Sequence, residues 1–100
     1  MITRIVKMSF KPDKVEDFKQ LFEQYKLQIA GAEGCISLRL LQEHESNIFF
    51  TYSEWQGEEY LEQYRRSDLF SKVWSQTKTF FNDKPQAWTT NVLFNSNSSS

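Results

Sequence analysis

The chain has 100 residues, enough for one domain, and its formal net charge of −1 leaves no basic surface of the kind that binds nucleic acid. No apolar run is long enough to span a membrane, and the N-terminus lacks a signal-peptide pattern, so we expect a cytoplasmic protein. One cysteine and one histidine can form neither an internal disulfide nor a His/Cys zinc site. Aromatic residues make up 16% of the chain, which indicates extra burial in an interface or a ligand pocket.

The first strand is predicted over residues 2–10, where apolar and polar side chains alternate. Arg4 interrupts the apolar face of this strand, which otherwise carries Ile2, Val6, Met8 and Phe10.

A helix is predicted over residues 13–30, because apolar side chains follow at helical spacing. Asp13 is the expected N-cap, with Glu16 completing a capping box. Gly31 and Gly34 are expected to end this helix.

Two strands joined by a polar hairpin loop come next, at residues 35–42 and 48–55. The earlier strand is expected to place Ile36, Leu38 and Leu40 on one face. The later strand carries aromatic side chains on both faces, namely Phe50 and Tyr52 on one and Phe49 and Trp55 on the other. A sheet with one face in water does not need this pattern, so both faces are expected to be covered.

The rest of the chain is predicted to form a short helix over 58–66 and a second one to about residue 82, capped by Ser67-Asp68. A fourth strand is predicted over 86–94, and the polar residues 95–100 form a tail. The order β-α-β-β-α-β predicts an α+β, ferredoxin-like split βαβ domain over residues 1–94. Its four-stranded antiparallel sheet would carry the helices on one face.

The other face of this sheet would be bare in a single chain. Because the third strand is aromatic on both faces, we expect a second copy to cover it in a homodimer formed through the open sheet face. The alternative is a monomer that exposes a large apolar patch.

Several short motifs resemble those of the antibiotic biosynthesis monooxygenase (ABM) domain family of dimeric α/β-barrel proteins. They are Thr51-Tyr52-Ser53-Glu54-Trp55, Glu59-Tyr60-Leu61, Tyr64-Arg65, Ser67-Asp68-Leu69-Phe70 and Trp74. The resemblance covers roughly residues 1–94. It implies a dimeric protein. Members of this family include enzymes that oxidise phenols, anthrones or quinols with O₂ without a metal or flavin cofactor.

The haem-degrading relatives are known for an Asn, a Trp and an iron-ligating His. The resemblance places Val6, Tyr64 and Trp74 at these positions, so all three differ. The only histidine, His44, falls in the hairpin loop. Haem degradation is therefore disfavoured, and no metal or cofactor site is expected.

The same positions imply a cavity between the sheet and the helices, lined by Val6, Tyr60, Tyr64, Phe70 and Trp74. Tyr64 is the candidate catalytic residue, because a phenol can donate a hydrogen bond to a substrate oxygen or move a proton. The alternative is a tyrosine that only packs its ring. Trp74 is either a stacking platform for the substrate or core filling.

Arg39 and Asn91 are candidate polar contacts to the substrate. Arg39 could bind an anion, or it could pair across the dimer. Asn91 could orient a substrate oxygen, or it could be satisfied locally.

The sequence therefore favours a cofactor-independent monooxygenase that acts on a small aromatic substrate, such as a quinol, a phenol or an anthrone. A non-catalytic dimer that binds small molecules on the same fold is the alternative. A third reading is a cofactor-independent isomerase or lyase.

Overall fold

The computed structural model describes residues 1–96, so residues 97–100 of the expected tail lie outside the described residues. The main elements are β1 (Ile2–Ser9), α1 (Val15–Ala30), β2 (Cys35–Gln42), β3 (Ile48–Trp55), α2 (Glu58–Arg65), α3 (Asp68–Thr77) and β4 (Gln86–Asn91). Two short 3-10 turns, Pro12–Lys14 and Lys78–Phe80, flank the long helices.

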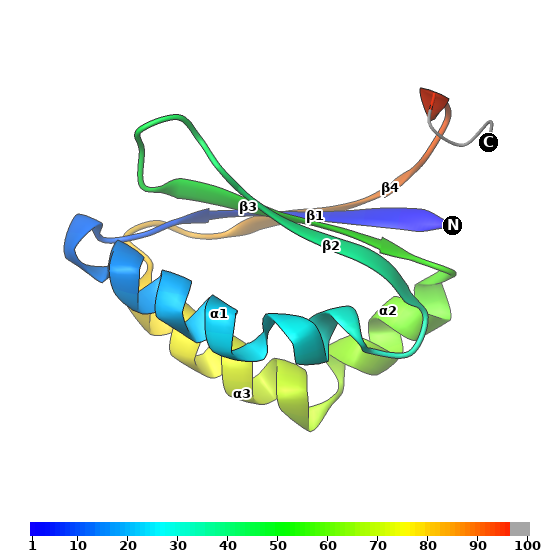
Figure 1. The fold of residues 1–100 in the computed structure, drawn as a ribbon, viewed down its shortest axis with the longest axis horizontal. Coiled ribbons are helices and arrows are strands. Elements are labelled where there is room, and N and C mark those ends of the chain that lie inside the picture. Colours follow the sequence, from blue (N-terminus) through cyan, green and yellow to red (C-terminus); the bar gives the residue numbers. More distant parts are fainter. Residues whose placement is uncertain (97–100) are drawn as a thin grey trace.

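The four strands form one antiparallel sheet in the order β2-β3-β1-β4. All three α-helices lie on the same side of this sheet, and the opposite face is bare (Figure 1). The predicted fold class, an α+β ferredoxin-like domain with helices on one face, is confirmed. The sheet of the single chain is open, with β2 and β4 as its edges, and does not close into a barrel.

The core lies where side chains at the end of β1 and the start of β3 pack against α1. Phe10 is fully buried, and its ring stacks on Phe18 of α1 at a centroid distance of 4.2 Å. Phe49 of β3 meets both rings edge-on. This cluster of rings fixes the helix layer on the sheet at one end of the molecule.

The two predicted helix caps have different outcomes. Asp13 is not an N-cap, because Pro12 starts a 3-10 turn before the α-helix, and the N-cap position of α1 is Lys14 without a side-chain hydrogen bond. The Ser67 cap is confirmed, since its Oγ accepts a hydrogen bond from the Phe70 amide at 3.1 Å. The helix that this cap opens ends at Thr77 and passes into a 3-10 turn.

Two strand predictions need correction. The fourth strand ends at Asn91 rather than at residue 94, because Asn91 pairs with Ile2, the first residue of β1, and no partner strand extends further. Leu93 beyond it is 95% exposed. Ile36 is not buried as an apolar-face residue would be: a register shift between Cys35 and Ser37 leaves it without a direct partner in β3, and it is 49% exposed.

The bare face of the sheet carries apolar side chains in neighbouring positions. Ile5 in β1 lies between Tyr52 of β3 and Trp88 of β4, and Phe50 lies opposite Lys7. Trp88 is 45% exposed. Among residues 1–96, no helix has the length and apolar character needed to cross a membrane.

Candidate functional site

A cavity of about 350 Å³ lies between the sheet and the helix layer. The sheet leaves room for it because the helix-facing side chains of this region are small, namely Thr51 and Ser53 of β3 and Ala87 of β4. All three α-helices and all four strands contribute to its lining.

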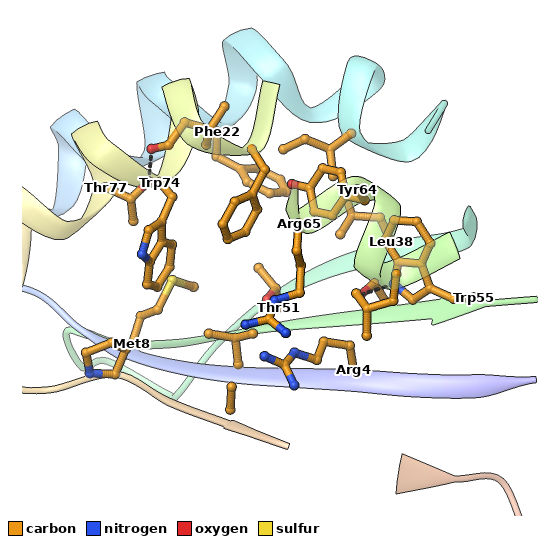
Figure 2. A pocket seen from close by; sticks show the side chains of 18 of the residues that line it. Arg4, Met8, Phe22, Leu38, Thr51, Trp55, Tyr64, Arg65, Trp74 and Thr77 are labelled. Atoms are coloured by element: carbon orange, nitrogen blue, oxygen red, sulfur yellow. Dashed lines mark hydrogen bonds between the residues drawn. The ribbon is translucent and has the colours of Figure 1, made fainter. Parts of the chain in front are cut away.

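One wall of the cavity is a continuous series of aromatic rings (Figure 2). Trp55 stacks on Tyr64 at a centroid distance of 5.2 Å, and Tyr64 meets Phe70 edge-on at 5.3 Å. Phe70 and Trp74 occur four residues apart on α3, so their rings stack nearly parallel, with an interplanar angle of 13°. Such a wall suits a flat, apolar ligand.

The structure brings together four of the residues expected at the site, since the lining includes Val6, Tyr64, Phe70 and Trp74. Figure 2 shows Trp74 extending from the helix layer toward Met8 on the sheet. Sequence reasoning did not single out Met8 or Thr51 as site residues, although the alternation of the strands places both on the helix-facing side.

The other three expected residues lie away from the cavity. Tyr60 packs on Gly34, where a Cβ atom would come within 2.3 Å of the Tyr60 ring. Arg39 is on the opposite face of the sheet, with its guanidinium 5.8 Å from the ring centroid of Tyr52. Asn91 is exposed at the end of β4.

Tyr64 is largely buried, and this burial raises the pKa of its phenol to about 12, with a smaller contribution from Cys35 nearby. Burial also raises the pKa of the Cys35 thiol. Within residues 1–96 the Tyr64 hydroxyl makes no hydrogen bond. At neutral pH it is therefore a neutral phenol, which can donate a hydrogen bond to a ligand but cannot act as a base.

We expect Tyr64 to ionise only in strongly alkaline solution. Because its folded pKa of about 12 exceeds the ordinary value near 10, the folded state holds this proton longer than the unfolded state does. Its contribution to stability is complete below pH ~10 and is lost as the pH rises toward 12. Ultraviolet titration of tyrosinate should show a late step that is absent in Tyr64→Phe. A Tyr64→Phe variant that lacks only an ordinary step near pH 10 would contradict this.

Two guanidinium groups also belong to the lining, those of Arg4 and Arg65. Arg4 Nη1 donates to Thr89 Oγ1 at 2.9 Å, and Arg65 Nη1 pairs with Glu62 Oε1 at 3.0 Å. Burial lowers the pKa of Arg4, and the charge of Arg65 lowers it further. Sequence reasoning treated Arg4 as an interruption of an apolar face and named Arg65 as part of a family motif. This interruption of the apolar pattern was the signal in the sequence that could have identified Arg4 as a site residue.

The lining contains no carboxylate and no imidazole from residues 1–96. His44 is in the exposed hairpin loop between β2 and β3 and is not among the lining residues. In the described part of the chain, no three His, Cys, Asp or Glu side chains gather in a way that could hold a metal ion.

An open antiparallel sheet, a broken second helix and an aromatic cavity between them define a ferredoxin-like α+β domain with an internal cavity. The particular family follows from the sequence: the chain belongs to the antibiotic biosynthesis monooxygenase family, whose sequence model matches residues 1–74.

Solved structures agree with this fold. A protein described as an antibiotic biosynthesis monooxygenase superposes with a TM-score of 0.87 at 13% identity, covering 93% of this chain and 99% of that one. Rv0793 from Mycobacterium tuberculosis gives a TM-score of 0.87 at 14% identity, covering 95% and 97%. A conserved protein from Methanosarcina mazei Go1 is 28% identical, with a TM-score of 0.82 and coverage of 89% and 90%. No curated protein shows significant similarity to this chain.

Proposed function

We propose that this protein is a cofactor-independent monooxygenase that oxidises a small aromatic substrate, such as a quinol, a phenol or an anthrone, with O₂. The observation that carries the proposal is the aromatic-walled cavity of about 350 Å³, in a chain that belongs to the monooxygenase family. A cavity of this size accommodates two or three fused rings. In this proposal, residues 1–94 form the domain that binds and oxidises the substrate.

The chemistry needs little from the protein because the substrate supplies the electrons. An acidic phenol or anthrone loses a proton and then reduces O₂ directly. In the complete reaction the substrate loses two hydrogen atoms and gains one oxygen atom, and the second oxygen atom leaves as water. Since the lining from residues 1–96 offers no carboxylate or imidazole, the proton passes to water. The protein orients the ring and excludes solvent.

Tyr64 is the proposed catalytic residue. Tyr64 lines the cavity and its hydroxyl is un-ionised at neutral pH, so in this proposal it acts by donating a hydrogen bond to the developing substrate oxyanion. Trp74 and Phe70, whose rings are nearly parallel, hold the flat substrate, and Val6 closes the sheet side.

The protein acts as a homodimer through the open sheet face. Support comes from the neighbouring apolar positions of Ile5, Tyr52 and Trp88 on that face, which a second copy would remove from water. Sedimentation at micromolar concentration should give twice the chain mass of 11.9 kDa, and a single-chain mass would contradict the dimer.

Oxygen uptake tests the proposed activity. Metal-free protein should consume O₂ with members of a panel of hydroquinones and anthrones, saturating with substrate. Tyr64→Phe should lower kcat by roughly tenfold, because one hydrogen bond to an oxyanion is lost. Trp88→Phe, on the opposite face, should leave the rate unchanged. Uptake no faster than the uncatalysed reaction across the panel would contradict the proposal.

A non-catalytic binding protein is the second candidate. It is favoured by the absence of a carboxylate or imidazole base among the lining residues of the described chain. Saturable binding of flat aromatics without oxygen uptake would select it.

A further inference from the structure

We propose that the cavity selects aromatic acids, that is, planar ring systems bearing a carboxylate, through paired guanidinium groups of Arg4 and Arg65. The inference rests on the proposed function in one respect, that the cavity is the ligand site. It adds that the ligand carries a negative charge, on a carboxylate group that the two arginines bind.

The two arginines reach the same place from opposite layers. Arg4 extends from β1 in the sheet, and Arg65, the last residue of α2, extends from the helix layer. Figure 2 shows their guanidinium groups facing one another at the sheet side of the cavity, with Thr51 beside them and the aromatic wall farther up. Arg65 is also exposed to solvent, so the pair lies at the edge of the cavity. Two planar guanidinium groups present several N–H donors in the fixed geometry that a carboxylate accepts.

The positive charge at this point is not neutralised within residues 1–96. Arg4 donates only to the neutral hydroxyl of Thr89 and has no carboxylate within salt-bridge distance. Arg65 pairs with Glu62, which offsets one of the two positive charges. The three groups together leave a net charge of +1 at the edge of an apolar cavity.

Like charges held close together are unfavourable unless an anion binds between them. The pKa of Arg4 is lowered first by burial and then by the charge of Arg65, and the charge of Glu62 opposes this shift only in part. A residual charge of +1 matches a monoanion such as a carboxylate better than a phosphate dianion. The apolar wall formed by Tyr64, Phe70 and Trp74 then requires that the rest of the ligand be aromatic or apolar.

Two probes of equal shape test the inference, 2-naphthoate and 2-naphthamide. Neither is a quinol or an anthrone, so their binding is independent of oxygen chemistry. Dissociation constants are measured by calorimetry at low and high salt. Wild-type protein should bind the carboxylate at least tenfold more tightly than the amide, and added salt should reduce this preference.

Arg4→Gln and Arg65→Gln should each remove most of the preference, since each loses charge-assisted hydrogen bonds while keeping a polar side chain. The matched control is Arg66→Gln, because Arg66 is exposed at the end of the same helix and outside the cavity lining. It should keep the full preference. Thermal melts identify any variant that fails to fold, and the other arginine variant and the salt dependence then carry the test.

Equal affinity of the wild-type protein for the two probes would overturn the inference, as would a preference that survives in both folded arginine variants. Failure of both probes to bind would overturn it as well. Oxygen uptake with neutral quinols is measured in parallel. If uptake persists in any of these cases, the proposed monooxygenase activity is supported and only the selectivity for aromatic acids is rejected.

Discussion

Replacing Trp74 with alanine is expected to weaken the binding of a flat aromatic ligand by roughly thirtyfold. Trp74 stacks on Phe70 and supplies a broad flat surface to the cavity wall. Loss of a stacked ring removes about 1 kcal/mol of specific aromatic interaction. A similar amount is lost with the buried apolar area. Together these give about 2 kcal/mol, which corresponds to the stated change in Kd.

Two further variants separate this role from general packing. Trp74→Phe keeps a flat ring and should retain most of the affinity. Trp88→Ala removes the same kind of side chain from the opposite face of the sheet and should leave ligand affinity unchanged. Calorimetric titration with 2-naphthoate measures all three. Unchanged affinity in Trp74→Ala would place the aromatic ligand elsewhere.

Gly34→Ala is expected to destabilise the domain by about 2–4 kcal/mol. The backbone φ of Gly34 is 82°, a left-handed conformation that costs an L-residue ~1–2 kcal/mol. The added Cβ would also lie 2.3 Å from Cγ of Tyr60, so α2 would have to shift away from the start of β2. Because α2 carries Tyr64 and Arg65, the shift should distort the cavity too.

Urea denaturation of Gly34→Ala and Gly31→Ala provides the comparison. Gly31 has an ordinary φ of −87°, and the nearest atom to its added Cβ is the Leu27 carbonyl oxygen at 3.2 Å. Its alanine variant should lose no more than about 1 kcal/mol of unfolding free energy. Equal losses in the two variants would mean that neither the left-handed conformation nor the Tyr60 contact matters for stability.

The fold could be predicted from the sequence because its signals are local and strong. Alternation identified β1, helical spacing identified α1, and Ser67 marked the start of α3. The errors occurred where a neighbouring segment decides the outcome. The end of β4 depends on where β1 begins, and the exposure of Ile36 depends on a register shift against β3. Neither can be read from the strand's own residues.

Some residues of the candidate site could likewise be predicted from the sequence, and others could not. Val6, Phe70 and Trp74 line the cavity because strand and helix periodicity place them toward the interior. Arg39 lies on the opposite face, since a one-residue step along a strand reverses the side chain's direction. Arg4 and Arg65 come together only through the packing of α2 over β1, sixty-one positions later in the chain. A pairing of that kind needs the tertiary structure.

The three tryptophans can show whether the cavity between the sheet and the helices binds an aromatic ligand. Trp55 and Trp74 line the cavity, whereas Trp88 is on the open face. Their indole N–H signals can be followed by NMR during titration with 2-naphthoate, after assignment by single Trp→Phe variants. We expect the Trp74 signal to shift most, with a smaller shift at Trp55 and none at Trp88. A shift confined to Trp88 would contradict this and place the ligand on the open sheet face.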